Sequence, residues 1–261
     1  MSPLTIIIII IILVLIYFFL RFLFVDKYTL QTMQNAQTAS TINASSLATN
    51  GSTVPSSNFT YSIWFYINSW NYRYGEKKVI FGRMGAQSTS SSGTSVAGLS
   101  GIDPCPAVVL EPVENNVSVS LGCYPGLSEE PSSSSTSSST TVNTVVHTCS
   151  VANVPVQSWV NLLVSVYGRS MDVYIDGKLV KTCLLPGIAA INNNANIHVT
   201  PNGGFDGYTA KLQYYPNATN PQQAWNIYSQ GYTNWLSSIF GPYQVQISLI
   251  ENGNVQNSVT I

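Results

Sequence analysis

The chain has 261 residues, of which 45% are hydrophobic and only 8% are charged. This hydrophobic content is enough to build a folded core and excludes a chain that is disordered throughout. There are 10 basic and 11 acidic residues, and the net charge of −1 leaves no basic cluster that could follow a phosphate backbone. We therefore expect no binding to nucleic acid.

Residues 4–25 are almost entirely apolar and include seven consecutive isoleucines, Ile6–Ile12. A helix of this length spans about 33 Å, which is enough to cross the roughly 30 Å hydrocarbon core of a bilayer. A cleaved signal peptide is the alternative, but the segment has no basic start, is too long, and has bulky residues 22–25 where a cleavage site needs small ones. The sequence predicts a single-pass anchor over residues 1–27 that contacts the lipid bilayer through residues 4–25.

The side of the membrane on which the C-terminal body lies stays open. Arg21 and Lys27 follow the apolar segment, and no basic side chain precedes it, so the positive-inside bias favours a cytosolic body. Five Asn-x-Ser/Thr sequons favour the opposite side, because they can be glycosylated only in the lumen. These possible glycosylation sites are Asn43, Asn50, Asn58, Asn116 and Asn217.

Residues 28–57 are polar and have almost no apolar periodicity, which predicts a polar stalk between the anchor and a folded body. A helix that continues from the anchor through about Gln37 is the alternative. We expect the folded body over residues 58–240, and a β-hairpin over residues 241–261 that belongs to the same body. Two tracts of Ser and Thr, residues 88–95 and 132–141, are expected to be loops.

Short strands separated by Gly, Pro, Asn and Ser predict an all-β fold for the body. From Phe59 to Asn68 apolar and polar residues alternate with period two, as in a strand. Further strands are expected over residues 77–83, 107–110, 117–121 and 159–167. Such a series of strands is typical of an antiparallel sandwich or barrel.

Two local signals are sharper. Asp176-Gly177, between two β-rich arms, supplies the positive φ angles of a type I′ turn and predicts a hairpin over residues 171–182. Asn220 as N-cap, Pro221 in the first turn and Gln223 in a capping box predict a short helix that ends at Gly231. Ala224, Trp225 and Tyr228 are expected on the buried side of this helix.

Four pieces in order resemble the laminin-G-like, concanavalin A-like jelly-roll family. They are the strand over residues 59–66, the strand that begins at Trp159, the segment Val173–Lys178, and residues 204–215 leading into the short helix near Trp225. The resemblance implies a two-sheet antiparallel jelly-roll sandwich with a concave face that binds sugars, proteins or lipid headgroups. Anchored domains of this kind also resemble virion proteins of large icosahedral DNA viruses, including minor capsid proteins and proteins of the inner membrane.

We expect no enzymatic activity. Glycosidases on this fold need paired carboxylates, but Glu111 and Glu114 are three residues apart and point to opposite faces of a strand. Neither His147 nor His198 stands in a hydrolase motif, and no Gly-x-Ser-x-Gly elbow is present.

We expect neither a cofactor nor a metal site, although the family often holds Ca²⁺. The acidic side chains that could bind it are Asp103, Asp172, Asp176 and Asp206. Four cysteines without a Cys-x-x-Cys pair give little support for zinc. They are either reduced and buried, or paired in disulfides, with Cys105–Cys123 as the expected pair.

The loop after the first strand combines aromatic rings with a guanidinium group. Trp70, Tyr72, Arg73 and Tyr74 are the candidate binding residues, whereas Trp64, Trp159 and Trp225 are expected in the core. The sequence favours a non-catalytic, membrane-anchored structural protein that links a membrane to a capsid shell by protein–protein interaction, as a virion component. A cell-surface or envelope lectin that binds carbohydrate is the alternative.

Overall fold

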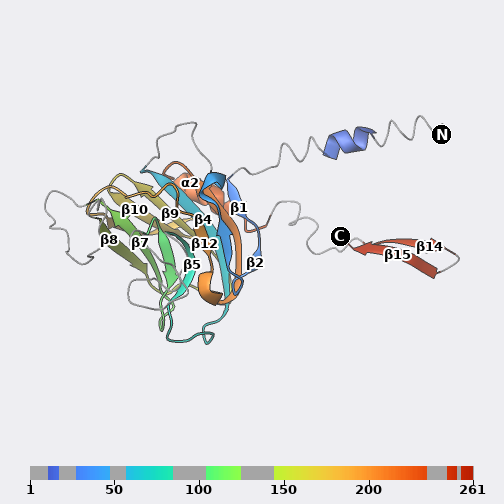
Figure 1. Cartoon of the computed structure of the whole chain (residues 1–261), viewed down its shortest axis with the longest axis horizontal. Helices are drawn as coiled ribbons and strands as arrows, with labels where there is room; N and C mark the ends of the chain where they lie inside the picture. The colour runs from blue at the N-terminus through green and yellow to red at the C-terminus, as the bar shows by residue number, and fades with distance from the viewer. Residues whose placement is uncertain are drawn as a thin grey trace.

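The structure, a computed structural model, describes residues 11–17, 28–47, 57–84, 104–124 and 144–233, and the backbone of residues 246–251 and 254–260. Thirteen strands of this part form two antiparallel sheets that pack face to face (Figure 1). The first sheet contains β1 (Thr29–Gln31), β2 (Gln34–Asn35), β4 (Phe59–Ser69), β9 (Trp159–Tyr167), β10 (Ser170–Ile175), β11 (Lys178–Leu184) and β13 (Asp206–Tyr215). The second contains β3 (Ser40–Ile42), β5 (Lys78–Arg83), β6 (Ala107–Leu110), β7 (Val117–Cys123), β8 (Val145–Val151) and β12 (Ile197–Val199).

The strand order is β1-β13-β4-β9-β10-β11 in the first sheet, where β2 also pairs with β13, and β3-β12-β5-β6-β7-β8 in the second. The expected all-β, two-sheet antiparallel sandwich is therefore confirmed. The order shows that β8 and β11 are the last strands of their sheets on one side of the sandwich. The two Ser/Thr tracts lie outside the described residues.

The core forms between the sheets from the side chains that the period-two pattern of β4 predicts. Phe59, Tyr61, Ile63, Phe65 and Ile67 are all at most 2% exposed and belong to one continuous apolar cluster. Burial in this cluster raises the pKa of the Tyr61 hydroxyl above its usual value. The alternate side chains of β4 point to the outer face of the first sheet.

The prediction of a polar stalk over residues 28–57 is wrong for residues 28–47, and so is the alternative of a helix through Gln37. β1 and β2 pair with β13, whereas β3 pairs with β12 of the other sheet. Short polar strands of this kind gain their stability from backbone pairing with strands far away in the sequence, so no local apolar pattern marks them.

The hairpin and the short helix are confirmed. β10 and β11 pair up to Ile175↔Lys178, and Asp176 and Gly177 both have positive φ. Helix α2 (Pro221–Ser229) has Asn220 as its N-cap and a complete capping box with Gln223. Its buried side differs from the expected one. Ala224 and Ile227 are buried and Tyr228 is half-buried, whereas Trp225 is 46% exposed, because the helix lies against the sheet with the Ala224/Ile227 side.

The chain outside the sandwich contributes two further elements. β14 (Gln246–Glu251) and β15 (Asn254–Thr260) form the expected C-terminal hairpin and pair with each other and with neither sheet. That this hairpin belongs to the sandwich stays a prediction. Residues 11–17 are helical, yet none of the described helices is long and apolar enough to span a membrane. Most of the predicted anchor lies outside the described residues.

Candidate functional site

Three loops gather at one end of the sandwich, which we call the Trp70 end: residues 70–77, 111–116 and 152–158. The first two are joined by a hydrogen bond from the Gly75 amide to the Pro112 carbonyl, 3.0 Å, and by the ion pair of Lys77 with Glu111, 3.8 Å. The third is joined to the end of β4 by the Gln157 amide, which donates to the Ile67 carbonyl at 2.8 Å. The loops are therefore fixed with respect to one another.

The second and third loops are bonded most closely. The Asn115 carbonyl accepts from the Val154 amide at 2.8 Å, and the Asn115 side chain donates back to the Val154 carbonyl at 3.1 Å. The Asn153 amide donates to Asn116 Oδ1, 3.1 Å. Asn153 has a positive φ of 58°, a conformation that costs energy outside glycine. The hydrogen bonds of residues 153 and 154 to Asn115 and Asn116 stabilise the loop in this conformation.

A groove of about 540 Å³ lies between these loops, and we call it the Trp70 groove. One aromatic ring, one carboxylate, three carboxamides and three small apolar side chains line it. These residues are Trp70, Val113, Glu114, Asn115, Asn116, Ala152, Asn153 and Val156. Glu114 is the one charged group of this lining, and its carboxylate accepts from Asn116 Nδ2 at 2.6 Å. The groove combines apolar surface with hydrogen-bonding groups and a net negative charge.

The predicted binding residues separate in the structure. Trp70 lines the groove and packs against the core cluster. Lys78, which is 2% exposed, places its ammonium group 4.9 Å from the centre of the Trp70 ring and donates to the Trp70 carbonyl at 3.4 Å. Burial, and to a smaller extent the nearby Arg73, lowers the pKa of Lys78. Lys78 therefore fixes the position of Trp70 through its contacts with the ring and with the backbone carbonyl.

Tyr72 and Arg73 hold the loop instead of facing a ligand. The Tyr72 hydroxyl donates to the Gly203 carbonyl, and Arg73 donates to the Asn202 carbonyl, so both are tied to the 3-10 helix η2 (Pro201–Gly203). Arg73 also forms an ion pair with Glu76, in which its Nε and Nη2 both donate to Oε2 of the carboxylate. Tyr74, in contrast, is 60% exposed and outside the groove lining.

A second aromatic group lies on the outer face of the first sheet, and the sequence did not single it out. Tyr208, Tyr66 and Trp159 are partners across β13, β4 and β9, and therefore form one row on one face. Tyr232 stacks on Trp159 with ring centres 4.3 Å apart. Trp159 is half-buried on this face instead of lying in the core. The alternation within β4 placed Tyr66 on this face, but only the strand register brings the other rings beside it.

Metal ligands do not gather in the described part of the chain, which contains no group of three or more His, Cys, Asp or Glu side chains. Asp172 accepts from Thr182, Asp176 from the Asn161 amide, and Asp206 from Asn68. These three carboxylates lie at different places, and Asp103 is outside the described residues. The expectation of no cofactor and no metal site, with calcium as the alternative, stays a prediction.

The expected Cys105–Cys123 disulfide is wrong. Cys149 and Cys183 are joined instead, with their Cα atoms 6.2 Å apart, whereas Cys105 and Cys123 are buried and take no part in this bond. The pairing follows from the two sheets meeting along β8 and β11, which neighbours in the sequence cannot reveal.

No protein-family model matches this chain, and no curated protein matches it either. Among solved structures, the ligand-binding domain of botulinum neurotoxin serotype D in complex with N-acetylneuraminic acid is similar at a TM-score of 0.49 and 11% identity, over 79% of this chain and 45% of that one. The receptor-binding domain of the botulinum neurotoxin C/D mosaic serotype is similar at a TM-score of 0.49 and 11% identity, over 77% and 42%. This chain spans less than half of either structure. At these TM-scores neither similarity identifies a ligand for it.

Proposed function

We propose that this chain is a non-catalytic recognition domain that an N-terminal membrane anchor displays, and that the Trp70 groove binds a neutral glycan. The observation that carries the proposal is the groove itself, whose walls are hydrogen-bonded to each other before any ligand arrives. Walls of this kind avoid the ordering cost that flexible loops pay on binding. The fold is compatible with the resemblance to the laminin-G-like family, which implies binding of sugars, proteins or lipid headgroups.

The composition of the groove favours a sugar. The flat apolar face of a sugar ring packs on an aromatic side chain, and its hydroxyl groups both donate and accept hydrogen bonds, as carboxamides do. Trp70 supplies the ring, and the carboxamides of Asn115 and Asn153 line the same groove. Because Glu114 is the one charged group of the lining, an acidic sugar such as a sialic acid would be repelled.

The place of the groove in the sandwich supports display from a membrane. β13 runs from Asp206, which pairs with Ser69 beside the groove, to Tyr215, whose ring centre lies 4.7 Å from that of Tyr28. The chain therefore enters the sandwich at the opposite end, roughly 30 Å from the groove for ten residues of strand. With the predicted anchor before Tyr28, the groove would face away from the bilayer.

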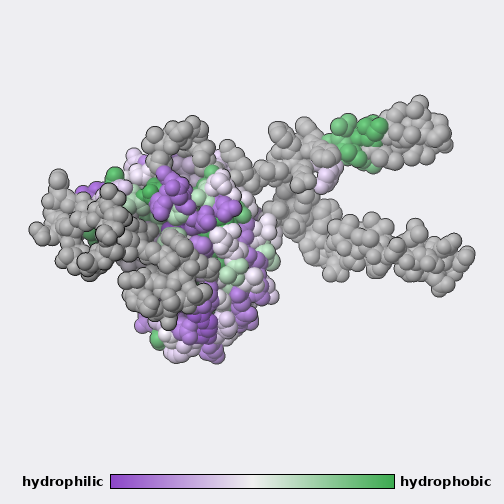
Figure 2. Space-filling model, in the orientation of Figure 1, coloured by the Kyte–Doolittle hydropathy of each residue, from purple (hydrophilic) through white to green (hydrophobic). Residues whose placement is uncertain are grey.

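The helical residues 11–17 support the anchor. They are apolar and 47–62% exposed, and Figure 2 colours them as hydrophobic, whereas the visible face of the sandwich is largely hydrophilic. A helix that is hydrophobic all round needs an apolar environment, and a bilayer is one.

Glycan binding is tested with the full-length protein in detergent micelles, on a panel of neutral oligosaccharides and their sialylated counterparts. We expect a neutral oligosaccharide to bind, and Trp70→Ala and Glu114→Gln each to weaken its binding about tenfold or more, which corresponds to about 1.4 kcal/mol. Tyr74→Ala is the control, because Tyr74 is exposed in the same loop but does not line the groove. Binding by no neutral oligosaccharide, or equal loss in all three variants, would refute the proposal.

A second candidate function is a scaffold between a membrane and a protein shell, such as the capsid of a virion. The observation that favours it is β11, the last strand of the first sheet, on which Leu179, Val180 and Leu184 are 48%, 47% and 73% exposed. Edge strands with apolar side chains are places where another protein strand can add. A stoichiometric complex with a capsid protein that Leu184→Glu breaks and Trp70→Ala leaves intact would favour the scaffold over the lectin.

A further inference from the structure

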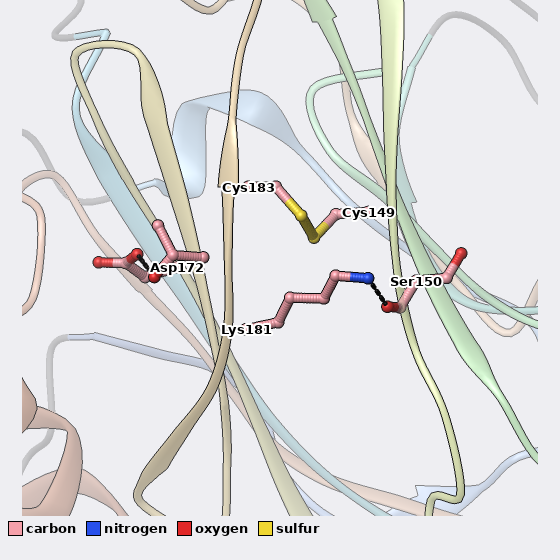
Figure 3. The surroundings of a disulfide bond; sticks show 6 residues. Cys149, Ser150, Asp172, Lys181 and Cys183 are labelled. Atoms are coloured by element: carbon pink, nitrogen blue, oxygen red, sulfur yellow. Dashed lines mark hydrogen bonds between the residues drawn. A yellow bond between two sulfur atoms is a disulfide. The ribbon is translucent and has the colours of Figure 1, made fainter.

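The disulfide between Cys149 and Cys183 links the two sheets along one side of the sandwich. Cys149 lies on β8 and Cys183 on β11, the last strands of their sheets, and the two side chains meet between these strands (Figure 3). Beside the disulfide, the Lys181 ammonium group donates to the Ser150 carbonyl, 2.7 Å. The bond thus closes an open side of the fold covalently.

Such a bond bears on the side of the membrane that the body occupies. Structural disulfides form and persist in oxidising compartments, and cytosolic thiols are kept reduced. Cys149 is 1% exposed and Cys183 is half-buried against the core cluster, so the bond is packed into the folded protein. The opposing argument depends on Arg21 and Lys27, two basic residues partly offset by Asp26, and is the weaker of the two.

The sequons within the described residues differ in the exposure and the hydrogen bonds of their asparagine side chains. Asn43 and Asn217 are exposed. Asn58 is half-buried, and its side-chain oxygen accepts from the Gly168 amide at 2.8 Å. Asn116 lines the Trp70 groove, and both ends of its carboxamide are hydrogen-bonded there, to Glu114 and to the Asn153 amide.

We propose that the sandwich lies on the lumenal or exoplasmic side of the membrane and carries N-linked glycans on Asn43 and Asn217. The membrane-side part of this inference depends on the anchor proposed above. Asn43 follows β3, where Ile42 pairs with Ile197, and Asn217 follows β13. Both lie at the end of the sandwich where the chain enters, so glycans there would leave the groove open.

The modification is a group transfer from a lipid-pyrophosphate-linked oligosaccharide. The asparagine Nδ2 forms a bond to C1 of the first sugar, the bond from C1 to the pyrophosphate oxygen breaks, and the amide loses one proton as the lipid pyrophosphate leaves. An exposed asparagine, such as Asn43 or Asn217, accommodates the product with less displacement of packed atoms than one inside a groove. At Asn116 the sugar would fill the groove, so that sequon is expected to stay unmodified.

The test is synthesis of the full chain with microsomal membranes, in a Ser52→Ala background that removes the Asn50 sequon. We expect a protease-protected body with two mobility steps that an N-glycosidase removes. Asn43→Gln and Asn217→Gln should each remove one step, and the matched control Asn116→Gln should remove none. Alkaline carbonate extraction of the same membranes tests the anchor separately.

A digestible body without a glycosidase-sensitive step would overturn the inference, even if the disulfide formed. A third step, or a step lost in Asn116→Gln, would overturn the assignment of the acceptors. If the body is glycosylated but alkaline carbonate releases it from the membranes, the anchor is refuted and the glycosylation is retained. The proposed glycan binding is tested separately from the glycosylation. Asn43→Gln and Asn217→Gln should leave binding to the oligosaccharide panel unchanged, so either proposal can fail without the other.

Discussion

The two ends of the sandwich are built from different chemistry. At the Trp70 end, loops carry charged side chains, and both ion pairs among the described residues lie there. At the opposite end, which we call the Tyr28 end, neutral hydroxyl groups bond to each other. The Thr219 hydroxyl donates to that of Thr60 at 2.9 Å, and its amide donates to Ser165 Oγ at 2.8 Å.

This difference indicates which end of the fold is suited to binding a ligand. Thr60 and Ser165 are at most 3% exposed and are covered by the segment before α2, and a pocket of about 400 Å³ lies between that segment, α2 and Tyr28. The Trp70 end holds loops in energetically costly conformations and leaves a groove between them. Substitutions at the two ends should therefore differ in what they change, with binding sensitive only at the Trp70 end.

The largest effect is expected from Gly207→Ala at the Trp70 end. An added Cβ would lie 1.8 Å from the Tyr66 carbonyl oxygen, so β4 and β13 would have to separate. We expect a loss of roughly 3–5 kcal/mol in the free energy of unfolding, measured by urea denaturation. The control is Gly168→Ala, where φ is 56° but nothing lies within 4 Å of the added atom. Its expected cost is about 1–2 kcal/mol, and equal losses in both variants would contradict the close approach.

Loss of the disulfide should have the next largest effect and act on both ends equally. Cys149→Ser combined with Cys183→Ser removes a link between residues 34 apart, and should lower the free energy of unfolding by about 3 kcal/mol. The folded double variant should still bind the neutral oligosaccharide. Peptide mapping without reduction is the independent check, because a crosslinked Cys105–Cys123 peptide would contradict the structure.

A matched pair of single hydrogen-bond deletions compares the ends directly. Asn115→Ala removes the bond to the Val154 carbonyl at the Trp70 end, and Thr219→Val removes the bond to Thr60 at the Tyr28 end. Each should cost about 1 kcal/mol of stability in urea titrations. Only Asn115→Ala should also weaken oligosaccharide binding. Weaker binding in Thr219→Val would show that the two ends are coupled.

The smallest expected effect is a pH dependence that comes from Lys78. Burial lowers its pKa in the folded state, so the unfolded chain binds the proton more tightly. Stability should therefore rise as the pH increases through the lowered pKa of Lys78 towards the ordinary lysine value, and protonation should oppose folding below that range. Lys78→Met should remove this rise in urea titrations below about pH 10.5, the ordinary lysine value. A rise that persists in Lys78→Met would assign it to another group.

Much of the fold was accessible from local patterns. The strand over residues 159–167, the turn at Asp176-Gly177 and the capped helix after Asn220 all agree with the structure. Each depends on residues within a few positions of one another, and period-two burial or turn chemistry is sufficient to specify them. The candidate loop was found for the same reason, since Trp70 to Tyr74 are neighbours.

The sequence did not predict which residues of that loop line the groove and which fix the loop in place. Trp70 faces the groove while Arg73 is tied to Asn202, because η2 happens to end beside the loop. The groove residues Asn115 and Asn153 carry no local signal either. Their proximity depends on where β6, β7 and β8 end in the second sheet.

By itself, therefore, the sequence determined an all-β sandwich, its central strands, its tight hairpin and its short helix. Tertiary structure alone decided that residues 29–42 contain three short strands instead of a stalk, that Cys149 pairs with Cys183, and that the Trp70 groove lies opposite the point where the chain enters. The physical reason is the range of the interactions. Periodicity and turn chemistry act over a few residues, whereas strand partners, sheet edges and loop contacts join residues that lie far apart in the chain.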